Sequence, residues 1–160
     1  MHEFLTALQA TPLAEVLRLG RWVYPFVNAG HIIGVALLFG AILPLDLRLL
    51  GCWPTVAVRP LARVLVPVAA TGLALACATG ALLFLTDPPG YAAMTLFRLK
   101  LALIGAGLLN VLWVHRSRAW RRVVDESVAP QRGSSLRLAG AVSALSWLAV
   151  LLCGRLIAYV

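Results

Sequence analysis

His31 is the residue whose type and position point most directly to chemistry. It lies in the apolar run 22–43, which is long enough to cross a membrane, and Gly30 and Gly34 are its close neighbours on that helix. An ionisable residue inside a membrane span predicts a ligand or a proton carrier. The sequence therefore predicts a polar site around His31.

Two interpretations of this stretch stay open on the sequence alone. The ring could be a neutral imidazole that bonds across helices, for example to Thr79 or Ser146. The two glycines form a GxxxG pair, which is typical of a helix-contact face. They also leave a bare strip beside the ring where a flat cofactor could lie.

Helical rise places several polar residues at a depth similar to that of His31. With each span centred on the bilayer and ~1.5 Å per residue, His31 lies ~3 Å toward the outer side, Lys100 ~8 Å and Arg155 ~10 Å. Asn28 shares this outer half, and Arg98 lies near its interface. No carboxylate is expected at this depth, although Asp87 in the outer turn could pair with one of the cations.

Haem b and quinone both fit such an outer site. Imidazole is a standard axial ligand, so His31 is the candidate haem iron ligand, and Arg98, Lys100 and Arg155 could pair with propionates. His115 lies ~18 Å below His31 by the same rise, so one iron cannot take both. A quinone headgroup near His31 and Arg155 fits about as well, and a protein without cofactor is an equal expectation.

Copper is a further alternative, because His31, Cys77 and Cys153 are expected at similar depths and thiolate with imidazole suits copper. The competing interpretation is that lone cysteines in a membrane are small apolar residues.

In the inner half the polar residues have expected structural roles. Asp46 and Arg48 cannot face each other at i,i+2 on one helix, so Asp46 is predicted to pair with Arg63 or Arg116. The structural polar set is Asp46, Arg48, Asn110 and His115.

Four apolar runs must position these residues. The chain has 160 residues, of which 61% are hydrophobic and 12% charged, whereas about a quarter are charged in a soluble domain. Each run has about 20 residues, enough to cross the membrane as a helix. The predicted spans are 22–43, 64–85, 94–114 and 138–160. The sequence predicts a single all-α integral membrane domain over residues 1–160, a four-helix bundle preceded by a short interfacial helix within 1–20.

The formal charge of +8 comes from arginines between the apolar runs, which sets topology and argues against nucleic-acid binding. The loops after the first and third spans hold Arg48, Arg59, Arg63, Arg116, Arg118, Arg121, Arg122, Arg132 and Arg137. The positive-inside rule predicts a bacterial inner-membrane protein with both termini periplasmic and both basic loops cytoplasmic.

The stretches WVYPFVNAGHIIGVALLFGAILPLDLRLLG, TGLALACATGALLF, FRLKLALIGAGLLNVLWVH and CGRLIAY resemble a family of small four-helix bacterial inner-membrane proteins, defined as a domain of unknown function. The resemblance covers nearly the whole chain and implies a fold but no activity. The family pattern falls on His31, Asp46, Arg48, Lys100, Asn110, His115 and Arg155. The first span and the FRLK stretch are also similar to copper-resistance membrane domains.

The sequence predicts no hydrolase or group-transfer enzyme, since paired carboxylates, a Ser–His–Asp set and a phosphate loop are missing from it. The expected function is a small haem b or quinone electron-transfer subunit of a larger oxidoreductase, with a periplasmic redox partner. The alternative is a non-redox scaffold, assembly or transporter-like subunit, or a copper-handling protein. Its GxxxG pair and many alanines predict a homo-oligomer or docking to a larger membrane complex.

Overall fold

The chain is a helical membrane protein. The computed structural model describes residues 2–125 and 135–159, which contain helices and no strands. Four of these helices are long and apolar enough to cross a membrane. They are α3 (Val23–Leu50), α4 (Val58–Phe84), α6 (Thr95–Arg116) and α8 (Ser135–Leu156), the last continued by the 3₁₀ turn η1 (Ile157–Tyr159). The predicted all-α four-helix architecture is confirmed, while Arg132 and Val160 lie outside the described residues.

α3 and α4 extend beyond the spans predicted for them. α3 has 28 residues, or ~42 Å of helix, which exceeds the ~30 Å core of a bilayer. The charges at Asp46 and Arg48 suggested that the helix ended before them, but Leu45 and Leu49 still pack into an apolar cluster with Val58. The helix therefore continues until Gly51, whose φ of 110° ends it.

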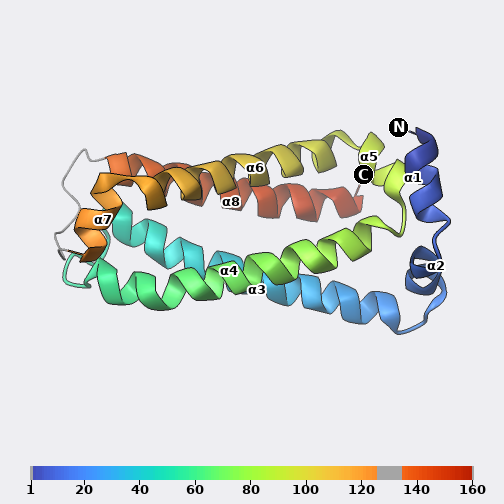
Figure 1. Cartoon of the computed structure of the whole chain (residues 1–160), viewed down its shortest axis with the longest axis horizontal. Helices are drawn as coiled ribbons and strands as arrows, with labels where there is room; N and C mark the ends of the chain where they lie inside the picture. Colours follow the sequence, from blue (N-terminus) through green and yellow to red (C-terminus); the bar gives the residue numbers. More distant parts are fainter. Residues whose placement is uncertain (1, 126–134, 160) are drawn as a thin grey trace.

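The four long helices pack in the order α4, α3, α8, α6 (Figure 1). α3 packs closely on α4 and also contacts α8, which in turn packs on α6. In the described part of the chain α4 and α6 form no close backbone interface. At the end of α4 their side chains meet where Phe84 of α4 stacks on Phe97 of α6, with ring centroids 5.4 Å apart.

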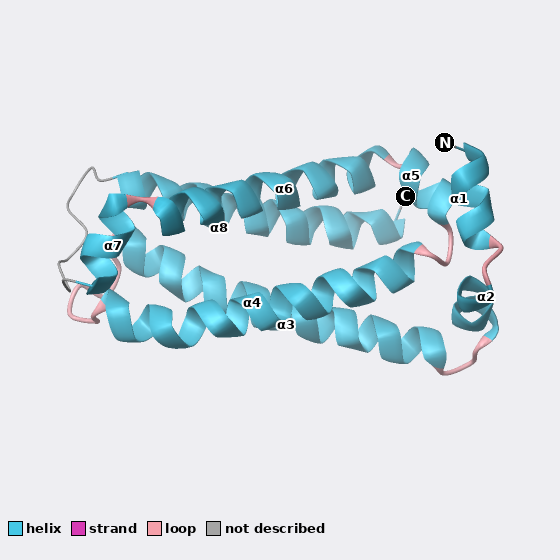
Figure 2. Ribbon diagram, viewed as in Figure 1, coloured by secondary structure: helices cyan, strands magenta, loops and turns pink. Residues whose placement is uncertain are grey.

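Short helices cover the two ends of the bundle (Figure 2). At one end lie α1 (His2–Gln9), α2 (Pro12–Leu19) and α5 (Pro88–Ala93) together with the C-terminal turn, and we call this the α5 end. At the other, α7 (Arg118–Asp125) contacts α4, α6 and α8, and we call this the α7 end. The N-terminal segment forms two helices rather than one, because Thr11 caps α2 and Pro12 starts it.

Small residues bring α3 and α4 together. A Cβ built on Gly34 would lie 2.6 Å from the Ala76 backbone nitrogen, and one on Gly72 would lie 2.5 Å from that of Leu38. Backbones this close leave no room for side chains at the crossing. The α3–α4 pair is thus the most tightly joined part of the bundle, and His31 lies one turn from its closest approach.

Candidate functional site

His31 is held by the helix opposite it. Its Nδ1 lies 3.0 Å from the Ala76 carbonyl oxygen and 3.2 Å from Thr79 Oγ1, both on α4. A carbonyl only accepts hydrogen bonds, so Nδ1 carries the proton and donates it. The interhelical bond to Thr79, one of the two interpretations of His31, is confirmed.

The hydrogen bond from Nδ1 determines the hydrogen-bonding role of the other nitrogen of the His31 ring. In a neutral imidazole with a proton on Nδ1, the other nitrogen Nε2 has a free lone pair. The same arrangement, with Nδ1–H donated to a backbone carbonyl, orients histidines that bind metals through Nε2. His31 is therefore anchored at one nitrogen and presents an acceptor at the other.

The glycines beside His31 are a helix-contact face. Gly34 meets the backbone of Ala76, and Gly30 faces the Thr79 methyl group, where an added Cβ would lie at 3.3 Å. The ring itself covers Gly80, with Cε1 3.1 Å from the position of a Cβ there. The expectation that a flat cofactor could lie on the glycine strip is wrong, because α4 fills that strip.

Lys100 of α6 is the predicted cation that shares a region with His31. The two side chains interact electrostatically. The Lys100 stem lies against α8, with Nζ 3.5 Å from the position of a Cβ on Gly154. His31 of α3 and Lys100 of α6 are thus both half-buried and close enough to interact.

The other predicted cations are engaged locally near the α5 end. Arg98 is exposed and donates to the Ala93 carbonyl at 3.0 Å. Arg155 is exposed and donates to the Tyr159 hydroxyl at 2.5 Å. Both groups have local partners near the helix ends, whereas a propionate bound beside His31 would need them to turn inward.

Two further polar residues complete this end of the site. Asn28 is half-buried in α3 and makes no hydrogen bond to a described residue through its side chain. The expectation that Asp87 could pair with a cation is wrong for the described residues, since its carboxylate caps α5 by accepting from the Gly90 amide. The site therefore has no carboxylate beside Lys100.

The copper alternative is not supported by the positions of its ligands. Cys77 is exposed on α4 and Cys153 is buried on α8. Among the described residues no group of three or more histidine, cysteine or acidic side chains could hold a metal ion. His31, Cys77 and Cys153 are not brought together.

Asp46 does not pair with arginine, so the prediction of a bond to Arg63 or Arg116 is wrong. Its carboxyl is buried against α8, where it lies beside Ser143. Arg63 is on an exposed face of α4, and Asp46 forms no ion pair within the described chain. The helix register turns Asp46 toward α8 and away from the basic surface.

The remaining inner residues have the following partners. Arg48 is buried and donates to the carbonyls of Val56 and Pro54. The Asn110 amide donates to the Ala139 carbonyl at 3.0 Å, which ties α6 to α8. His115 is exposed near the end of α6, where its Nδ1 bonds to the Val111 carbonyl and its ring lies 5.1 Å from that of Trp120.

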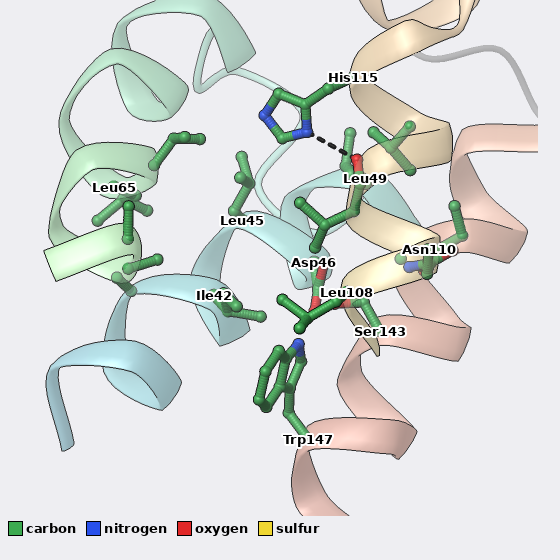
Figure 3. Close-up of a pocket in the computed structure, with 18 of the residues that line it drawn as sticks. Ile42, Leu45, Asp46, Leu49, Leu65, Leu108, Asn110, His115, Ser143 and Trp147 are labelled. Carbon is green, nitrogen blue, oxygen red and sulfur yellow. Dashed lines mark hydrogen bonds between the residues drawn. The ribbon is translucent and has the colours of Figure 1, made fainter. Parts of the chain in front are cut away.

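A cavity toward the α7 end was not predicted from the sequence. It has a volume of about 340 Å³ and its lining includes Asp46, Asn110, His115 and two residues that sequence reasoning missed, Ser143 and Trp147 (Figure 3). A signal for Trp147 was present, because an indole N–H in the middle of an apolar span needs a partner.

No protein-family model, curated protein or solved structure matches this chain. The geometry of its own residues therefore carries the functional argument.

Proposed function

We propose that this protein is a small membrane subunit that binds the ring of a quinone or quinol between His31 and Lys100. One observation carries the proposal: His31 is fixed through Nδ1 to the Ala76 carbonyl, so that Nε2 remains as an acceptor in the part of the bundle that Lys100 enters from α6. A quinol hydroxyl can donate to Nε2, and the Lys100 ammonium can donate to a ring oxygen.

The shape of the bundle supports a ligand that comes from the lipid. α4 and α6 have no close backbone interface, so a lipophilic ring that comes from the lipid would enter between them beside the stacked pair Phe84 and Phe97. Oxidation of a bound quinol releases two electrons and two protons. In this proposal His31 accepts one proton through Nε2, the other leaves to water at the α5 end, and a partner oxidoreductase takes both electrons.

Haem b is the second candidate, and the orientation of His31 is the observation that favours it, because axial imidazoles are commonly oriented by an Nδ1–H bond to a carbonyl. A haem would have to lie on the Nε2 side of the ring, since α4 fills the glycine strip. Bound haem would supply a one-electron redox centre, and Lys100 could hold a propionate.

The setting we propose is the bacterial inner membrane, with the α5 end periplasmic and the arginine-rich α7 end cytoplasmic. The redox partner would then dock at the α5 end, close to His31 and Lys100. Self-association or assembly into a larger membrane complex belongs to the same proposal.

The test uses a substitution that separates the two nitrogens of His31. In His31→Asn the amide nitrogen can keep the bond to Ala76 while Nε2 is lost. We expect this variant to insert normally and to bind a short-chain benzoquinol, kept reduced, at least about tenfold more weakly, as measured by equilibrium dialysis of protein in lipid nanodiscs, because the hydrogen bond from the quinol hydroxyl to Nε2 is lost in a desolvated site.

His115→Ala is the matched control, since His115 is exposed at the α7 end, and its quinol affinity should equal that of the wild type. A visible spectrum tests the haem candidate, because a haem protein shows a Soret band that His31→Asn would remove. A colourless wild type whose quinol affinity is unchanged in His31→Asn would contradict both candidates.

A further inference from the structure

The cavity toward the α7 end lies at a different depth from His31. It is enclosed by α3, α4, α6 and α8, and Trp120 of α7 lies at its end. Its walls are mostly aliphatic, with side chains such as Leu38, Leu45 and Leu65. An apolar cavity of about 340 Å³ is within the size range of small-molecule sites.

Two buried polar atoms in the lining of this cavity have no hydrogen-bond partner among the described residues. They are Asp46 Oδ2 and Trp147 Nε1, on side chains that are 5% and 4% exposed. In Figure 3 the indole nitrogen lies on the edge of the Trp147 ring that faces Asp46. A buried polar group without a partner costs free energy, so two such atoms on side chains that line one cavity indicate a missing hydrogen-bond partner.

The neighbouring polar groups do not relieve either atom. Ser143 lies beside the Asp46 carboxyl, yet Oδ2 stays unpaired. The Asn110 amide is used by the Ala139 carbonyl. Trp147 packs on Gly107, where an added Cβ would lie 3.3 Å from the indole ring. Neither atom therefore has a partner among the described residues, and as a donor and an acceptor that line one cavity they can be bridged by one ligand.

The hydrogen-bonding capacities of Asp46 Oδ2 and Trp147 Nε1 limit which functional group a ligand can use to pair with both atoms. Trp147 Nε1–H only donates, whereas a carboxylate oxygen of Asp46 only accepts. An ammonium group would leave the indole unpaired, and an ether or ketone would leave an ionised Asp46 unpaired. A hydroxyl group serves both, because its hydrogen is donated to Asp46 while its oxygen accepts from Trp147.

We infer that this cavity binds a hydrophobic molecule through a phenol or alcohol hydroxyl, with Asp46 and Trp147 as its hydrogen-bonding residues. The apolar walls take the hydrophobic body of the molecule. Bound water could satisfy the two polar atoms, but water alone does not stably fill a cavity with walls this apolar. This site is separate from the quinone site proposed at His31 and does not depend on it.

The ligand can reach the cavity from the bilayer. The lining residues Leu108 and Leu112 of α6 are 40% and 45% exposed, and Ala70 and Leu73 of α4 lie in the same lining. These are the two helices without a close backbone interface. The cavity therefore reaches the lipid-facing surface on the α4–α6 side.

The test compares three probes that differ only in their hydrogen-bonding group: 4-hexylphenol, its methyl ether and hexylbenzene. Binding to protein in nanodiscs is measured by equilibrium dialysis, with empty nanodiscs subtracted. We expect the wild type to prefer the phenol over the ether by about tenfold or more, since the ether cannot donate to Asp46. In Trp147→Phe and in Asp46→Leu this preference should fall below about threefold.

Two further measurements test whether the phenol binds in this cavity. The phenol should shift the indole N–H resonance of Trp147 in ¹⁵N-tryptophan-labelled protein, a signal assigned by its loss in Trp147→Phe. Trp113→Phe, on the exposed face of α6, should retain the wild-type preference. Equal binding of phenol and ether by the wild type, or an unchanged preference in both cavity variants, would overturn the inference.

Discussion

Arg48 is a buried cation whose partners are backbone carbonyls. The side chain is 4% exposed and donates to Val56 at 2.5 Å and to Pro54 at 3.2 Å, both in the loop that follows α3. A buried charge is costly unless its donors are satisfied. Here the loop folds back over the guanidinium and supplies the acceptors, so one residue joins the end of α3 to the start of α4.

Arg48→Met should therefore destabilise the protein by about 1.5 to 3 kcal/mol, the range for hydrogen bonds that involve a charged group. The measurement is reversible unfolding in mixed SDS–detergent micelles. Arg63→Met is the control, because Arg63 is exposed on α4, and its effect should lie within about 0.5 kcal/mol of zero. Equal stability of the two variants would show that the loop is not held by Arg48.

At the scale of helices, α3 and α4 approach each other closely because glycines at their crossing have no side chain. A Cβ on Gly34 would approach the Ala76 backbone nitrogen to 2.6 Å, a contact that requires the helices to separate. Gly40, on the same helix, offers the opposite case, because a Cβ there meets nothing within 4 Å. Alanine substitutions at Gly34 and Gly40 therefore separate the effect of helix–helix packing from the effect of helix propensity.

We expect Gly34→Ala to destabilise the protein by about 1 to 3 kcal/mol through overpacking. Gly40→Ala should be neutral or stabilise it by up to about 1 kcal/mol, since alanine favours the helix. Both are measured by the same micelle unfolding. A Gly34→Ala variant as stable as Gly40→Ala would mean that the α3–α4 approach is not what holds this pair together.

The long helices and their close contacts could be predicted from the sequence because hydropathy and the spacing of small residues are local signals. The four spans, the contact role of Gly34 and the bond from His31 to Thr79 all follow from residues that face one another at a matching depth. The surroundings of Asp46 could not be predicted in that way. Depth says how far a residue lies along the bundle, but which neighbouring helix it faces depends on the packing order, which puts Asp46 against Ser143 of α8.

The cavity could not be predicted from the sequence for the same reason. Apolar periodicity indicates that Leu45, Leu65 and Leu108 lie on or in a bundle, but not whether they fill the space between helices. That depends on how far α4 and α6 stand apart, which no local pattern records. Trp147 was overlooked for this reason, because its indole N–H indicates that a partner is needed but not what space lies beside the ring.

For the whole molecule, the two ends differ in charge. The α7 end carries exposed arginines on α6 and α7, namely Arg116, Arg118, Arg121 and Arg122. At the α5 end, α1 and α2 lie across the bundle beside α5 (Figure 1). Since arginine-rich loops are retained in the cytoplasm, we propose from this asymmetry that the His31 site lies near the periplasmic side and the Asp46 cavity near the cytoplasmic side.

This orientation is tested with two reporters, alkaline phosphatase, which is active only in the periplasm, and a fluorescent protein that matures in the cytoplasm. A fusion after Val160 should give phosphatase activity without fluorescence, and one after Ser134 the reverse. Replacing the four exposed arginines at the α7 end by glutamine should weaken this bias and produce a mixture of orientations, because the retained charge is what fixes the loop inside. The opposite reporter pattern in the wild type would place His31 near the cytoplasmic face and would move the proposed redox partner to that side of the membrane.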